Sequence, residues 1–152
     1  MVYLALISRV VGTSDEQYEI TKSWNRGLQM LWATQQMDDE VDNGGFNQYF
    51  FNSSGQWAME AIEGLRLIGA VERAEIVAAA VDQFFSDAPK LKQYYNDHTL
   101  ESFSESYKHT NLGVLDKRWY AGPDFHRART KYIRDHPDEF VLPPADDRAR
   151  LH

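Results

Sequence analysis

The chain has 152 residues, of which 43% are hydrophobic and 13% aromatic, a composition that suits one packed globular domain and excludes a disordered segment. It contains no cysteine, which excludes disulfides, zinc–thiolate clusters and thiol catalysis. A formal net charge of -7 argues against direct nucleic-acid binding, because phosphate contacts need a basic face.

The first apolar run spans residues 2–11. Its length fits either a short strand or a helix packed on the core, and the sequence leaves both open. Arg9 interrupts the run, no basic residue precedes it, and it is too short to cross a bilayer. We therefore expect no targeting segment and no membrane contact, and the lack of cysteine favours a cytoplasmic protein.

Residues 15–37 carry the strongest helical periodicity in the chain. Large side chains recur every three or four residues and line one face, namely Ile20, Trp24, Leu28, Leu31 and Gln35. Thr13 with Glu16, or Ser14 with Gln17, offers a capping box for the first turn of this helix.

Two further amphipathic helices are predicted at residues 56–68 and 70–85. Gly69 separates them and suits the left-handed conformation that ends many helices. Because the connection is short, the two helices are expected to pack as an antiparallel αα-hairpin. Their outer, polar faces carry Glu60, Glu63, Arg66, Glu72, Arg73, Glu75 and Asp82.

The periodicity weakens from Asp87 to Gly113, where Pro89 and a serine-rich stretch predict a loop with one short helix. A last helix is predicted to begin at Pro123, which suits the first helical position, and to end at Pro137.

These elements predict an all-α fold. We expect a compact single-domain helical bundle over residues 1–140, with the αα-hairpin at its centre. Residues 141–152 have little apolar content and are predicted to form a mobile tail.

The segment from Glu40 to Gly55 has the most distinctive composition in the chain. Asn43, Gly44 and Gly45 predict a sharp turn, because glycine reaches positive φ without a steric penalty. After the turn, three aromatic side chains fall on one face of a two-turn helix: Phe46, Tyr49 and Phe50. Residues 52–55 then close this helix and offer a cap to the next.

This segment resembles the signature of a bacterial DNA-mimic protein family, which reads Glu-Val-x-Asn-Gly-Gly-Phe-x-Gln-Tyr-Phe-x-Asn-Ser-Ser-Gly. Residues 68–70 and 115–120 add weaker matches, and the resemblance covers roughly residues 15–135. It implies an all-helical fold. It also implies, as for the founding member of that family, an acidic homodimer that occupies the DNA-binding surface of a transcription factor.

No motif for catalysis, a cofactor or a metal is found. The glycine pair is not followed by the Lys-Ser/Thr of a phosphate-binding loop, and the five histidines show no pair at metal-binding spacing. Carboxylates three residues apart on a helix, such as Glu60 and Glu63, are typical of a solvated face. We therefore expect no cofactor, no metal site and no catalytic residue.

A run of four carboxylates lies next to the predicted turn: Asp38, Asp39, Glu40 and Asp42. Negative charge at a helix C-terminus opposes the helix dipole. Either Glu40 or Asp42 caps the following short helix, or the run is a binding epitope. The excess acid lies in the first half of the chain, since residues 1–88 hold 13 Asp/Glu against 5 Lys/Arg and residues 89–152 hold 10 against 11.

The leading hypothesis is a non-catalytic protein-interaction module that docks an acidic surface on a basic protein. Mimicry of DNA on a DNA-binding transcription factor is its special case. The hypothesis includes no direct contact with nucleic acid or membrane. The residues predicted to bind the partner are Asp38, Asp39, Glu40, Asp42, Glu60, Glu63, Glu72 and Glu75.

The alternative is a small-ligand-binding protein or an enzyme with a polar-aromatic pocket around Gln48. Amide and aromatic side chains suit such a pocket, although no titratable group in it has an obvious chemical role. The residues predicted to line it are Asn43, Phe46, Gln48, Tyr49, Asn52, Trp119 and Tyr120. An enclosed polar cavity at Gln48 would favour this alternative.

Overall fold

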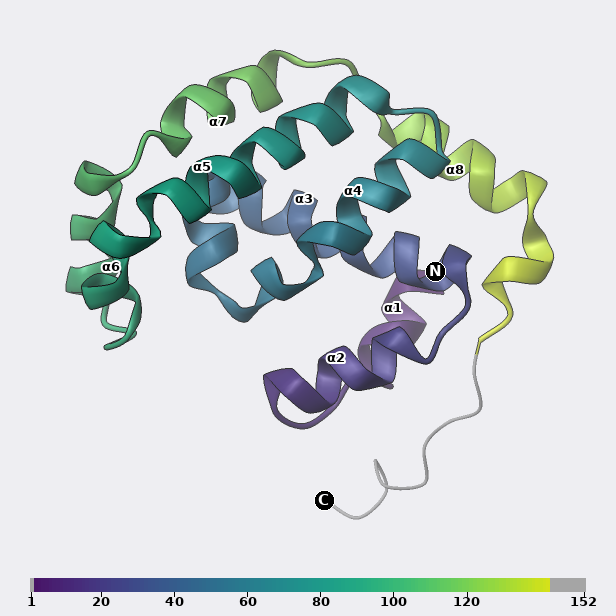
Figure 1. Cartoon of the computed structure of the whole chain (residues 1–152). Coiled ribbons are helices and arrows are strands. Elements are labelled where there is room, and N and C mark those ends of the chain that lie inside the picture. Colours follow the sequence, from purple (N-terminus) through teal and green to yellow (C-terminus); the bar gives the residue numbers. More distant parts are fainter. Residues whose placement is uncertain (1, 143–152) are drawn as a thin grey trace.

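The computed structural model describes residues 2–142 of the chain (Figure 1). Within that range the protein is all-α, as predicted, with no β-strand. The predicted mobile tail lies outside the described residues from position 143 onward. The α-helices are α1 (Val2–Ile7), α2 (Ser14–Lys22), α3 (Arg26–Phe51), α4 (Ala58–Leu67), α5 (Val71–Tyr95), α6 (Leu100–Ser106), α7 (Leu112–Ala121) and α8 (His126–Asp135). Three 3-10 helices join them, η1 (Ser53–Trp57), η2 (Tyr107–His109) and η3 (Pro137–Phe140).

The predicted helix at residues 15–37 is wrong in its extent, because two helices share that region. The Thr13–Glu16 capping box starts α2, as predicted. The chain then breaks at Trp24, whose buried ring packs on the core, and the Asn25 side chain accepts the Leu28 amide at 3.0 Å to start α3. The Gln29 amide closes the break by donating to the carbonyls of Lys22 and Trp24.

Helix α3 is the central element, and α1, α2, α4, α5, α6 and α7 all contact it. Its course changes at Gly44 and Gly45, where the backbone is not helical. Gly45 has φ 71° and ψ -177°, which confirms the predicted turn. The turn directs Phe46 and Tyr49 into the core, where both are 0% exposed.

Helices α4 and α5 form the predicted αα-hairpin. Gly69 adopts φ 79° between them, and α5 turns back alongside α4 (Figure 1). The prediction that α5 ends near residue 85 is wrong, because the helix continues through Pro89 to Tyr95. Proline costs a helix the hydrogen bond to the carbonyl four residues earlier, which belongs here to the exposed Phe85.

The continuation of α5 is stabilised by tertiary contacts. Leu91 is 1% exposed. The buried Asp87 carboxylate accepts hydrogen bonds from Gln83, Thr110 and Asn111, which joins α5 to the start of α7. Burial opposes ionisation of Asp87, but these donors hold its pKa below the ordinary value.

The region predicted as a loop contains the expected short helix, α6, and the sequence analysis did not predict α7, which follows it. The last helix begins at His126 rather than at Pro123, because Gly122 is extended and the carbonyls of Gly122 and Pro123 accept hydrogen bonds from Arg73. Pro137 follows the end of α8, as predicted. The first apolar run, left open between strand and helix, forms α1.

The core has two aromatic centres. Trp32 makes edge contacts with Trp24 and Trp57, at centroid distances of 5.8 and 6.0 Å. On the other side of the Gly44–Gly45 break, Trp119 packs edge-on between Phe46 and Phe125. Among residues 2–142, no helix is long and apolar enough to cross a membrane.

Substitution of Gly45 by alanine should destabilise the protein by about 2 kcal/mol or more. The conformation at Gly45 is essentially restricted to glycine, and an added Cβ would lie 2.6 to 2.8 Å from the Asp116 carboxylate atoms. Urea denaturation followed by circular dichroism measures the change.

Gly113→Ala is the matched control, because it lies in α7 and its Cβ would meet nothing closer than 4.0 Å. This variant should be neutral or more stable by up to about 1 kcal/mol. Equal stability of the two variants would contradict the structure of the turn.

Candidate functional site

The amide side chains of the signature segment bind within the fold. Gln48 and Asn52 donate to Glu40 at 2.7 and 2.9 Å, and the Ser54 hydroxyl donates to the same carboxylate at 3.2 Å. Asn47, which is 1% exposed, donates to Ser106 and accepts from Tyr95. Glu40 therefore joins the two sides of the turn through side chains, whereas the backbone amide of Phe46 at the start of the following helical segment binds Asp116 instead of the predicted cap, Glu40 or Asp42.

Helix α7 and the residues before it close the turn from the outside. The Asp116 carboxylate accepts the Phe46 amide at 2.8 Å, and burial raises the pKa of Asp116 while this bond opposes the rise. The Tyr120 hydroxyl donates to the Val41 carbonyl at 2.6 Å, and the Tyr107 hydroxyl donates to the Gly44 carbonyl. These contacts satisfy backbone groups that the break in α3 leaves unpaired.

Most of the residues predicted for the alternative pocket are packed in the core or hydrogen-bonded to other side chains. Phe46, Tyr49 and Trp119 are at most 2% exposed and belong to the core, and the Gln48 amide is taken by Glu40. Asn43 and Tyr120 are exposed. A recess beside Trp57 and Glu60 lies elsewhere and is too small to hold a ligand.

The eight carboxylates predicted to bind a partner divide by exposure. Asp38 is only 6% exposed, so its prediction as a surface residue is wrong. Glu40 and Glu60 are half-buried and accept hydrogen bonds from other side chains. The exposed members are Asp39, Asp42, Glu63, Glu72 and Glu75.

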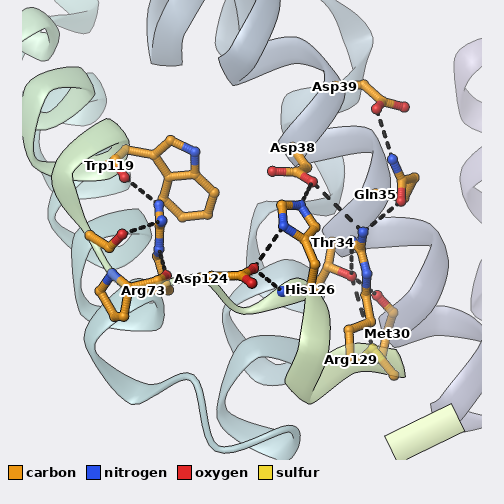
Figure 2. Close-up of polar contacts among 12 residues, drawn as sticks. Met30, Thr34, Gln35, Asp38, Asp39, Arg73, Trp119, Asp124, His126 and Arg129 are labelled. Atoms are coloured by element: carbon orange, nitrogen blue, oxygen red, sulfur yellow. Dashed lines mark hydrogen bonds and ion pairs between the residues drawn. The ribbon is translucent and has the colours of Figure 1, made fainter. Parts of the chain in front are cut away.

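Asp38 is buried where α8 brings the His126 ring and the Arg129 guanidinium to its carboxylate (Figure 2). His126 Nε2 lies 2.7 Å from Asp38 Oδ2, and His126 Nδ1 lies 3.0 Å from Asp124 Oδ1. Arg129 Nη2 lies 3.7 Å from Asp38 Oδ2 and donates to Gln35 at 2.8 Å. Burial raises the pKa of Asp38, and the contacts with His126 and Arg129 oppose that rise.

A second arginine, Arg73, is buried although the sequence analysis placed it on the outer face of its helix. Its guanidinium donates to the carbonyls of Trp119, Gly122 and Pro123 (Figure 2). Arg73 thereby caps the C-terminal end of α7. The guanidinium carbon also lies 4.3 Å from the centroid of the Trp119 ring. The carbonyls and the ring recover part of the cost of burying this charge.

Exposed carboxylates gather around these two arginines. Burial lowers the pKa of Arg73, and the charges of Asp38, Asp42, Glu72 and Asp124 oppose that shift. In the same way, burial lowers the pKa of Arg129, and Asp38 and Asp39 oppose it. Glu75 lies three residues after Glu72, so it shares that face of α5. We call the exposed set the acidic surface; it consists of Asp39, Asp42, Glu72, Glu75 and Asp124.

The sequence analysis missed Arg73, Asp124, His126 and Arg129. The spacing of His126 and Arg129 places both on one face of a helix. Nothing in the sequence indicates that this face contacts Asp38, which precedes His126 by 88 residues. Both ring nitrogens of His126 contact carboxylates, those of Asp124 and Asp38. Among the described residues, no group of three or more His, Asp or Glu side chains could hold a metal ion.

A scan of protein families matches residues 22–136 to the family described as DMP19-like protein. The match covers the signature segment, the hairpin and the residues around Arg73 and Arg129. No curated protein and no solved structure matches the chain.

Replacing Arg129 by methionine should destabilise the protein by about 3 kcal/mol near pH 8, because Asp38 then stays buried with less compensating charge. Loss of Arg129 raises the pKa of Asp38 further, so the folded state takes up a proton more readily than the unfolded chain. The loss of stability caused by Arg129→Met is therefore fully present above the folded-state pKa of Asp38. It should shrink as the pH falls from about 8 toward about 4.

Denaturation midpoints of wild type and variant across this pH range test the expectation. Arg127→Met is the control, because the Arg127 side chain is 96% exposed on the same helix. It should change the midpoint little at any pH. A pH-independent deficit in Arg129→Met would mean that the guanidinium does not compensate Asp38.

Proposed function

The chain belongs to the DMP19-like protein family, and we propose that it is a non-catalytic protein-interaction module whose acidic surface binds a basic surface on another protein. The observation that carries the proposal is the gathering of four exposed carboxylates around two buried arginines, namely Asp39, Asp42, Glu72 and Asp124. Glu75 shares the face of α5 that carries Glu72. Three segments far apart in the sequence thus contribute charge of one sign to one region.

The acidic surface suits long-range attraction. Exposed carboxylates raise the rate at which a basic partner is captured, and salt weakens this effect over a distance of about 8 Å at physiological ionic strength. The buried arginines lie beneath the surface, where their side chains are bound to carbonyls and to Asp38. Their charges are thereby compensated inside the protein, and among the exposed residues Arg127 offsets part of the negative charge at Asp124, 3.9 Å away.

The narrower form of the proposal is mimicry of DNA. The family resemblance suggests a DNA-binding transcription factor as partner and a homodimer as the binding form, and the lack of cysteine suits a cytoplasmic complex. Mimicry further requires that the carboxylates match phosphates, which lie about 7 Å apart along one strand.

A catalytic function is less well supported. The predicted pocket residues are packed in the core or bound to Glu40, and the His126 ring has both nitrogens engaged by carboxylates. A general base needs an accessible nitrogen next to a reacting proton.

The triple variant Asp39→Lys, Asp42→Lys, Glu75→Lys should keep its helical content and weaken partner binding by about tenfold or more at low salt. Asp38 stays unchanged because it is buried in an ion pair. The partner is first recovered by affinity capture with wild-type protein, and its affinity is then measured for each variant at low and high salt.

A matched triple, Glu19→Lys, Glu101→Lys, Asp138→Lys, makes the same charge change at exposed positions outside the acidic surface. This control variant has the same net charge as the first triple variant, but it should bind the partner with close to wild-type affinity. If the two triples behave alike, or if wild-type affinity does not depend on salt, the acidic surface is not the binding site. Competition by duplex DNA for the same partner would support the mimicry of DNA. Absence of competition would exclude the mimicry but leave the broader proposal of an acidic binding surface intact.

A further inference from the structure

The His126 ring lies between two carboxylates (Figure 2). Its Nε2 is 2.7 Å from Asp38 Oδ2, and its Nδ1 is 3.0 Å from Asp124 Oδ1. The ring also stacks on the buried Phe125 at a centroid distance of 4.6 Å, which holds its orientation. This imidazole therefore joins a buried carboxylate of α3 to an exposed carboxylate of the acidic surface.

Both contacts need a proton on the ring nitrogen. A neutral imidazole has one N–H donor and one lone-pair acceptor, whereas an imidazolium has two donors. An ionised carboxylate only accepts, and Asp124 Oδ1 already accepts the backbone amide of His126 at 2.8 Å. With both carboxylates ionised, the two contacts are satisfied together only by the imidazolium form of His126.

Loss of this proton removes one donor, and exposure decides which carboxylate loses its partner. The Asp38 side chain is 8% exposed, and the Asp124 side chain is 55% exposed. A buried carboxylate without a partner is costly, whereas water solvates an exposed one. The remaining N–H therefore stays on Nε2 toward Asp38. Asp124 then faces solvent without a cationic ring beside it.

The arginine and tyrosine side chains around His126 keep their charge state near neutral pH. Arginine stays protonated, and Tyr3 stays neutral because burial raises its pKa to about 12. Imidazole is the side chain that ordinarily changes charge between about pH 5 and 8. The surrounding groups are Tyr3 of α1, Asp38, Asp39 and Asp42 of α3, Glu72 and Arg73 of α5, Asp124 before α8, and Arg127 and Arg129 of α8.

We propose that His126 is a proton-dependent switch of the acidic surface, which binds a basic partner more strongly when His126 is neutral than when it is an imidazolium. The effect on a partner rests on the proposed function, whereas the protonation of the ring does not. The imidazolium places a positive charge next to Asp124 and lowers the attraction of this surface for cations.

The first test follows the ring nitrogens of His126 by NMR in the full chain, from about pH 5.5 to about pH 8.5. We expect two ring N–H groups at the acidic end and Nε2–H alone at the basic end. Retention of the proton on Nδ1 instead would overturn the proposal. So would a ring that is neutral throughout while the Asp38 carboxyl takes up the proton.

The second test measures binding of the peptide acetyl-Arg-Gly-Arg-Gly-Arg-Gly-Arg-amide at low salt across the same pH range. Arginine keeps its charge at each pH, so the peptide itself does not titrate. The affinity of wild type should rise about two- to fivefold as His126 loses its proton. His126→Gln keeps an N–H donor for Asp38 and cannot be protonated, so it should have the higher affinity at both ends of the range.

His136→Gln is the matched control, because His136 is exposed at the far end of the same helix. It should keep the wild-type pH dependence. If His126→Gln loses helicity, the wild-type profile decides, because the change in affinity must follow the His126 resonances. Equal pH dependence in wild type and a folded His126→Gln variant overturns the proposal, as does a change that follows another histidine.

The peptide titrations separate the switch from the acidic surface. If the peptide binds wild type without dependence on pH, the switch is overturned and the acidic surface stands. If the peptide does not bind even at low salt, the acidic surface fails and the switch falls with it.

Discussion

Gly45 and Asp116 form the contact on which the rest of the structure depends. Gly45 needs a positive φ and no side chain, because the Asp116 carboxylate lies where a Cβ would be and binds the next amide. This contact divides α3 into two segments with different directions. The first segment packs its Trp32 against Trp57, and the second packs its Phe46 against Trp119. The turn thereby joins the two aromatic centres and fixes α7 on the central helix.

The buried arginines link this scaffold to the acidic surface. Arg73 binds the carbonyls at the end of α7, and Arg129 holds α8 against α3 through Asp38 and Gln35. Both charges are buried, and both are compensated by groups from other segments. The same contacts that dock α7 and α8 therefore also determine where Asp124 lies relative to Asp42 and Glu72.

Most side chains of the signature segment, residues 40–55, serve the packing and hydrogen bonding of the protein interior. Glu40, Asn47 and Gln48 form hydrogen bonds inside the fold, and Phe46 and Tyr49 are core residues. Family membership consequently constrains the path of the backbone more than the chemistry of the surface. The exposed carboxylates of the acidic surface lie outside this segment, apart from Asp42.

The sequence by itself determined the features that depend on neighbouring residues, namely the capping box at Thr13, the turn at Gly45 and the hairpin around Gly69. Residues within a few positions suffice to predict the cap and the two glycine conformations, whereas the Asp116 carboxylate that binds the Gly45 turn is supplied by the tertiary structure. Only the tertiary structure decided that the chain breaks at Trp24, continues through Pro89 and buries Asp38 and Arg73. Those outcomes depend on partners tens of residues away, such as Thr110 for Asp87 and Pro123 for Arg73. A charge three residues from another on a helix looks solvated until the fold supplies the carbonyls, rings and counter-charges that compensate its burial.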